Sequence, residues 1–134
     1  MCMIGDFEEL TQIRKEYPIL AYRAWVGRDP NLYSTSFGPD RPWPRTKLKH
    51  ADCIPTAEPT HGVWAFMAPE ERNFYFVGNH TVLGTVLLWG TVAVHARGYR
   101  AEYAKIFSLT EFNNHDKVST IAAHYNVPIF PASL

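Results

Sequence analysis

Residues 87–105, LLWGTVAVHARGYRAEYAK, place a histidine, an arginine and a glutamate close to one another. An imidazole beside a guanidinium and a carboxylate could transfer protons, so His95, Arg100 and Glu102 could begin an active site. Such a site needs a pocket whose burial shifts a pKa, which the tip of a twisted hairpin seldom provides. Cross-strand pairing of charged groups needs no further purpose. We therefore interpret the three residues as a solvated cluster or the rim of an interface.

A second set of residues has the types that ADP-ribosyl transfer requires. Arg23 could clamp a dinucleotide phosphate, Ser34 could hold the nicotinamide ribose, and Glu70 or Glu71 could polarise a ribose hydroxyl. The order is right, but the spacing from Arg23 to Ser34 is short, and the glutamates follow a proline in a predicted turn. Short strings of this kind are weak evidence. A small nucleotide-binding or ADP-ribosyltransferase-like enzyme using Arg23, Ser34 and Glu70 is the alternative function.

A third set could bind a metal. Imidazole and thiolate are zinc ligands, and His50, Cys53 and His61 have the spacing H-x2-C-x7-H. This spacing matches no zinc-finger motif, and such a group arises easily by chance. The two cysteines, Cys2 and Cys53, indicate no disulfide framework. We predict neither a metal nor a cofactor, and metal binding by the three residues stays open.

The composition describes one neutral domain. The 134 residues include 13 Lys and Arg against 13 Asp and Glu, with 46% hydrophobic and 14% aromatic residues. A chain of this length forms one core, so we predict a single domain over residues 1–134. Balanced charge without a basic stripe argues against nucleic-acid binding.

We expect no membrane-spanning or targeting segment. Apolar runs such as Val86–Trp89 are far shorter than the about 20 residues that a membrane span needs. Residues 1–20 carry several charges in place of the apolar centre of a signal peptide. We predict a cytoplasmic protein without membrane contact.

The pattern of elements predicts an α+β fold, in which a curled antiparallel sheet of five or six strands packs against short N- and C-terminal helices. Asp6 and Glu9 resemble a capping box, and Pro18 ends the helix that they begin. Five prolines exclude a regular ladder from the long central loop. The predicted segments are a helix at 6–17, strands at 19–27 and 61–68, a proline-rich loop at 38–60, a β-hairpin at 82–109 and a helix at 116–126.

The strongest pattern is the alternation of valine, leucine and glycine along residues 82–94, which predicts one apolar face on a long strand. Gly98 supplies the positive φ that a two-residue turn requires, so we expect the turn at Arg97-Gly98. This register pairs Val94 with Ala101, Val92 with Tyr103, Leu88 with Phe107, and His95 with Arg100. It also puts Trp89 on the face opposite the valines. A three-residue loop would shift the pairing and give a less consistent pattern.

The hairpin also carries a recognisable motif, made of Leu88-Trp89-Gly90, His95 and the segment GYRAEYA at 98–104. The motif resembles a group of small, functionally unassigned bacterial and phage-encoded β-rich proteins that share an LWGxVxxHxxGYRAEYA-like hairpin. The resemblance extends more loosely over residues 20–110. It implies a β-rich accessory protein, encoded by a bacterium, a phage or a mobile element, and it indicates no reaction.

The aromatic residues exceed what one face of a small sheet easily covers. Tryptophan, tyrosine and arginine are the usual anchors of protein interfaces, and Trp89 is the sharpest candidate because of its predicted face. A second small core beneath the helices or the proline-rich loop would explain the same residues. The predicted binding residues are Trp89, Trp43, Tyr99, Arg100, Glu102 and His95.

These observations together favour a non-enzymatic protein-interaction or regulatory accessory protein, which binds a protein partner through an aromatic sheet face. Enzymatic activity is the less favoured reading. The identity of the partner and the oligomeric state stay open, including a homodimer formed through an edge of the sheet.

Overall fold

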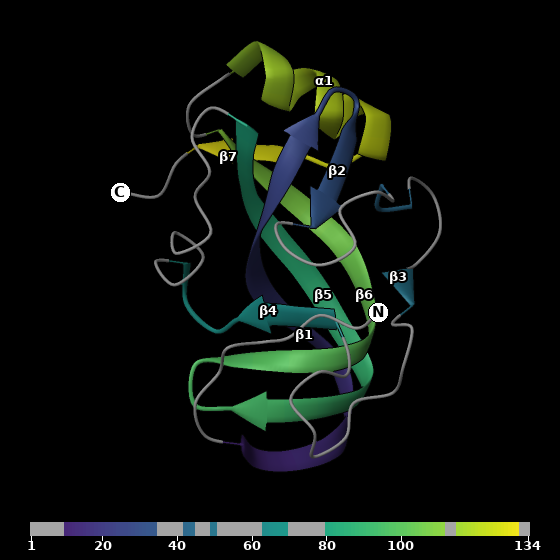
Figure 1. Ribbon diagram of the computed structural model, residues 1–134, viewed down its shortest axis with the longest axis vertical. Coiled ribbons are helices and arrows are strands. Elements are labelled where there is room, and N and C mark those ends of the chain that lie inside the picture. Colours follow the sequence, from purple (N-terminus) through teal and green to yellow (C-terminus); the bar gives the residue numbers. More distant parts are fainter. Residues whose placement is uncertain are drawn as a thin grey trace.

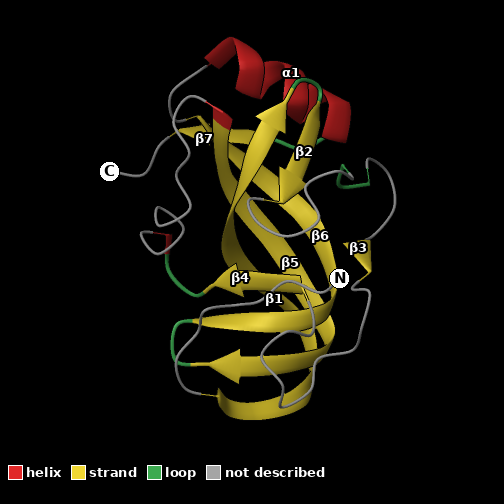
Figure 2. Cartoon of the chain, viewed as in Figure 1, coloured by secondary structure: helices red, strands yellow, loops and turns green. Residues whose placement is uncertain are grey.

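The computed structural model describes residues 10–34, 42–44, 49–50, 63–69, 80–111 and 115–131. In this part of the chain the fold is mostly antiparallel sheet with one helix (Figure 1 and Figure 2). The elements in chain order are β1 (Leu10–Arg28), β2 (Asn31–Ser34), β3 (Lys49–His50), β4 (Val63–Phe66), β5 (Thr81–His95), β6 (Gly98–Glu111), α1 (His115–Tyr125) and β7 (Ile129–Pro131). The predicted β-rich fold with a C-terminal helix is confirmed.

Four of the strands form a closed ring. β5 pairs with β1 on one side and with β6 on the other, and β4 pairs with both β6 and β1. The contact between β4 and β1 consists of one residue pair, Tyr22 with Phe66. All these pairings are antiparallel, whereas β7 joins β6 in parallel. The sheet therefore curls around itself, which is visible in the lower half of Figure 1.

The N-terminal helix predicted at 6–17 is wrong where the structure describes it, because residues 10–17 belong to β1. They pair with the end of β5 that lies next to the hairpin turn. The register shifts between Glu16 and Ile19, where Pro18 has no backbone donor to contribute. Helical spacing of apolar residues is a weak prior, and strand pairing over a long sequence distance overrides it here. Residues 6–9 lie outside the described part.

The main core lies on the inner side of the sheet and continues beneath α1. Its buried members include Ala21, Trp25, Leu32, Trp43, Val86, Leu88, Val92, Leu109, Val118, Ile121 and Tyr125. A Cβ at Gly27 would lie 2.7 Å from Val82 and 3.0 Å from Ile121, so a glycine is needed where the helix approaches β1. The helix ends as predicted, because Asn126 adopts a left-handed conformation with φ of 55°.

The hairpin is present, but its predicted register is wrong. The turn consists of Ala96 and Arg97, so Val94 pairs with Tyr99 and Val92 pairs with Ala101. Near the tip, each β5 residue pairs with a β6 residue two positions earlier than predicted. Because side chains alternate with a period of two, the residues predicted to share a face there still share it. A register shift between Trp89 and Val92 then exchanges the faces of β6, so that Trp89 pairs with Tyr103.

Only parts of the proline-rich segment predicted at 38–60 are described. Lys49 and His50 form the short strand β3, which pairs with β6, and residues 42–44 lie against the core through Trp43. The prediction that no ladder enters this segment is therefore wrong for these two residues. In the described residues, the helical structure is too short or too polar to span a bilayer.

Candidate functional site

The side of β1, β5, β6 and β7 that faces away from the main core carries a cluster of apolar side chains, which we call the outer face. Two cross-strand rows make its centre: Leu20 pairs with Leu87 and Leu87 with Lys105, while Trp89 pairs with Tyr103. The described members of the outer face used below are Leu20, Leu87, Trp89, Tyr103, Lys105, Phe107 and Phe130.

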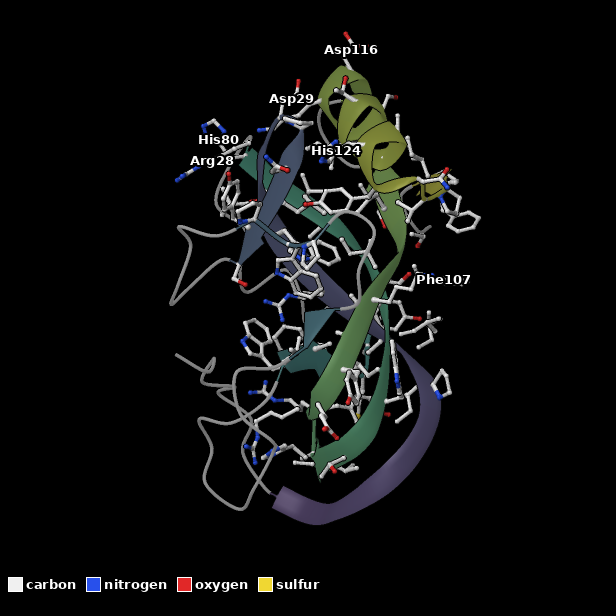
Figure 3. All side chains as sticks on the ribbon, turned by 90° about the vertical axis from the view of Figure 1, so that its right-hand side faces the viewer. Arg28, Asp29, His80, Phe107, Asp116 and His124 are labelled. Carbon is white, nitrogen blue, oxygen red and sulfur yellow. The ribbon has the colours of Figure 1, made fainter. Side chains whose placement is uncertain are left out.

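All three large hydrophobic side chains that are strongly exposed in the described residues lie on this outer face. Leu20 is 46% exposed, Phe107 45% and Phe130 51%. Phe130 belongs to the face because Thr110 pairs with both Leu83 and Phe130. Figure 3 shows Phe107 on the outside of β6. Scattered exposed hydrophobics are ordinary, whereas these three share one face of one sheet.

The local sequence explains why these side chains face outward. Along β5 the buried residues Val86 and Leu88 alternate with the half-buried residues Leu87 and Trp89, as a strand with one core face requires. Phe107 does not follow this alternation, because the β5–β6 register shifts beside it. Ile106 pairs with Val86 and Ser108 pairs with Thr85, which leaves Phe107 between two consecutive pairs. The extra residue of such a bulge has no cross-strand partner.

A second bulge supports the aromatic pair at the centre of the outer face. Trp89 stacks on Tyr103 with ring centroids 5.7 Å apart and an interplanar angle of 15°. The next residue, Gly90, has φ of +84°, which glycine adopts without strain. The backbone N–H of Thr91 donates to Glu102 Oε1 at 3.2 Å, so the glutamate satisfies an amide where the ladder is irregular.

Glu102 therefore contacts the Thr91 amide at the bulge. The other two residues of the predicted cluster, His95 and Arg100, contact each other. Arg100 Nε donates to His95 Nε2 at 2.9 Å. An accepting Nε2 requires a neutral imidazole that carries its proton on Nδ1. Burial and, to a lesser extent, the charge of Arg100 lower the pKa of His95, and burial lowers the pKa of Arg100.

The predicted solvated cluster is wrong for this pair. His95 is 3% exposed and Arg100 is fully buried. Both faces of the sheet are buried near the hairpin tip. Val94 and Ala101 belong to the main core on one face, and on the other face Arg100 pairs with the buried residues Trp64 and Ala93.

A second buried cation lies where the sequence suggested a nucleotide site. The structure brings Arg23 and Ser34 together, with Arg23 Nη2 donating to Ser34 Oγ at 3.1 Å. The Arg23 guanidinium also donates through Nη1 to the Trp64 carbonyl oxygen. Its Cζ atom lies 4.7 Å from the ring centroids of both Trp43 and Trp64. Glu70 and Glu71 lie outside the described residues.

Trp43 belongs to this buried cluster and not to a surface. Its indole N–H donates to Ser34 Oγ at 3.2 Å, and its ring meets Trp25 edge-on with centroids 5.5 Å apart. Tyr125 holds the same segment from α1, because its hydroxyl donates to the Trp43 carbonyl at 2.8 Å and accepts from the Leu32 N–H at 3.0 Å. Burial raises the pKa of Tyr125.

Among the predicted binding residues, the structure places Trp89 on the outer face and leaves Tyr99 half-buried against the main core. The described residues hold no cluster of three metal-ligating side chains. Cys53 and His61 lie outside the described part. Sequence reasoning missed Leu20, Phe107 and Phe130, because strand alternation alone does not reveal a bulge or the pairing of β7.

Comparison with protein-family models, curated proteins and solved structures finds no match to this chain. The hairpin resemblance therefore stays a prediction.

Proposed function

We propose that this chain is a non-enzymatic interaction protein that binds a protein partner through the outer face. The observation that carries the proposal is the placement of the exposed Leu20, Phe107 and Phe130 on this one face. Apolar patches of this kind mark contact surfaces on proteins, since exposing them to water is unfavourable. The stacked pair of Trp89 and Tyr103 adds the aromatic types that dominate interface energetics.

The candidate surface is narrower than the sequence suggested. Trp43, His95 and Arg100 are buried, so they would affect binding only by stabilising the fold. A regulatory role, and an origin in a phage or mobile element, stay predictions.

We do not propose the nucleotide-binding alternative. A phosphate clamp must present its guanidinium to the ligand, whereas Arg23 is fully buried with tryptophan rings near it and with Ser34 and Trp64 as hydrogen-bond acceptors. In this arrangement the arginine has a structural role.

The test compares partner capture by the wild-type chain and by a Leu20→Asp, Phe107→Asp double variant. Both side chains are exposed, so the variant should keep the fold, which circular dichroism and thermal unfolding would verify. A matched control is Thr120→Asp with Ala123→Asp, which adds the same two charges at exposed positions of α1.

We expect the wild type and the α1 control to capture the same protein, and the outer-face variant to lose it. The captured protein would then be purified and titrated against all three chains. Equal binding to the outer-face variant would show that the outer face is not the contact surface, and the proposal would fail.

A further inference from the structure

The outer face combines its apolar side chains with a positive charge. Among the outer-face side chains named above, Lys105 carries the only formal charge, and it is exposed in the same cross-strand row as Leu20 and Leu87. Glu102, three residues earlier, contacts the amide of Thr91. A cation amid apolar side chains is complemented best by a partner's carboxylate.

The size of the outer face limits what can cover it. From the row of Trp89 to the row of Leu83, across β1, β5, β6 and β7, the strand geometry gives at most roughly 20 Å by 15 Å, or about 300 Å². The exposed area is smaller, because Leu83, Ser108 and Thr110 within this span are buried. A stable interface between two folded proteins buries about 800 Å² on each partner. A second copy packed face to face would therefore bury too little, whereas a short segment of chain would cover the face fully.

On the basis of the proposed function, we infer that the outer face binds a short apolar segment of a partner protein that carries an acidic side chain opposite Lys105. A segment of about six extended residues has the length of the face. Leu20, Phe107 and the stacked pair of Trp89 and Tyr103 would contact its apolar side chains, and Lys105 would fix its register through one carboxylate.

The experiment is selection from a random linear peptide library displayed on phage, with the purified full chain as the target. Lys105→Glu reverses the charge at the centre of the face. Arg28→Glu is the matched control, because Arg28 is also exposed and lies toward the α1 end of the molecule, on the other side from Phe107 (Figure 3). The Leu20→Asp, Phe107→Asp variant removes the apolar contacts.

We expect peptides selected on the wild type to combine aromatic or aliphatic residues with Asp or Glu, and peptides selected on Lys105→Glu to carry Lys or Arg in its place. A selected acidic peptide should bind Lys105→Glu about tenfold more weakly than it binds the wild type. It should bind the Arg28→Glu control about as tightly as the wild type.

Three results would contradict the inference, and some of them would also contradict the proposed function. Peptides that require Leu20 and Phe107 but show no acidic preference would overturn the acidic segment and leave the proposed function standing. Peptides that bind the Leu20→Asp, Phe107→Asp variant equally well, or no enrichment at all, would overturn both. Dimerisation of the wild type that the same double variant abolishes, measured by sedimentation, would assign the face to a second copy.

Discussion

At the scale of single residues, two buried arginines make different contacts through the same kind of side chain. Arg23 lies close to two tryptophan rings and donates from its edge to Ser34 and Trp64, whereas Arg100 donates to a neutral histidine. A planar guanidinium offers faces to rings and edges to acceptors, which lysine cannot do. Because burying a cation costs free energy unless it is hydrogen-bonded, each acceptor near these arginines is important for stability.

Ser34→Ala should lower the free energy of unfolding by about 1–3 kcal/mol. Ser34 Oγ accepts from both Arg23 Nη2 and the Trp43 indole, and alanine would leave two buried donors without that acceptor. Urea unfolding followed by tryptophan fluorescence measures the effect. Thr120→Ala removes an exposed hydroxyl from α1 and should change stability by under about 0.5 kcal/mol. Equal effects of the two substitutions would contradict the role of the buried hydroxyl.

The His95–Arg100 pair predicts a loss of stability in mild acid. The pKa of His95 is lowered in the folded chain, so the unfolded chain takes up this proton first as the pH falls. The contribution of His95 is therefore complete above about pH 6.5 and declines below it until the folded pKa is passed. Urea midpoints at pH 7.5, 6.5 and 5.5 should fall for the wild type.

The decline should be smaller in His95→Gln, whose side-chain oxygen can still accept from Arg100 but does not titrate. The comparison is of slopes, since the substitution itself will lower stability at every pH. Parallel slopes for the two proteins would show that His95 does not couple acid to unfolding.

At the scale of elements, two irregularities in the β5–β6 ladder decide which side chains face water. The shift beside Val86 leaves Phe107 exposed, and the shift at Gly90 brings Trp89 and Tyr103 together. A regular hairpin would have placed Tyr103 on the other face. Bulges of this kind redirect side chains without adding an element.

Gly90→Ala should destabilise the fold by about 1–3 kcal/mol, because φ of +84° strains an L residue. The added Cβ would also lie 2.8 Å from the Tyr103 ring and 3.2 Å from Glu102 Cβ. Thermal unfolding measures the loss. Gly90→Asn should lose less stability than the size of the asparagine side chain alone would suggest, since asparagine tolerates left-handed conformations better than alanine. A neutral Gly90→Ala substitution would mean that the bulge is dispensable.

The sequence predicted the hairpin and the C-terminal helix because each has a strong local pattern: alternation along residues 82–94 and the stop at Asn126. It failed where the pattern was set by a distant partner. Residues 10–17 have helical spacing but pair with β5. Of the predicted binding residues, Trp89 was placed on the correct face, whereas no local pattern indicated that His95 and Arg100 are buried.

At the scale of the whole molecule, the ring of β1, β5, β6 and β4 has one weak junction. β1 and β5 pair along most of their lengths, and so do β5 and β6, whereas β4 has four residues and meets β1 at the single pair of Tyr22 and Phe66. Opening of the ring should therefore begin at β4 and not within the hairpin.

Hydrogen exchange followed by mass spectrometry should reveal this difference. Peptides covering residues 63–66 should exchange faster than peptides covering residues 83–88, which have hydrogen-bonded neighbours on both sides. Equal protection of the two segments would mean that the ring opens as one cooperative unit.

The closed ring also has a consequence for synthesis on the ribosome. β1 is made first, yet its main partner is complete only when His95 has been added, and within the described ladders residues 10–16 pair with β5 alone. Until then the nascent chain carries a long strand without its neighbour, and unpaired strands readily attract other chains. Chains released before the hairpin is finished would therefore aggregate instead of folding.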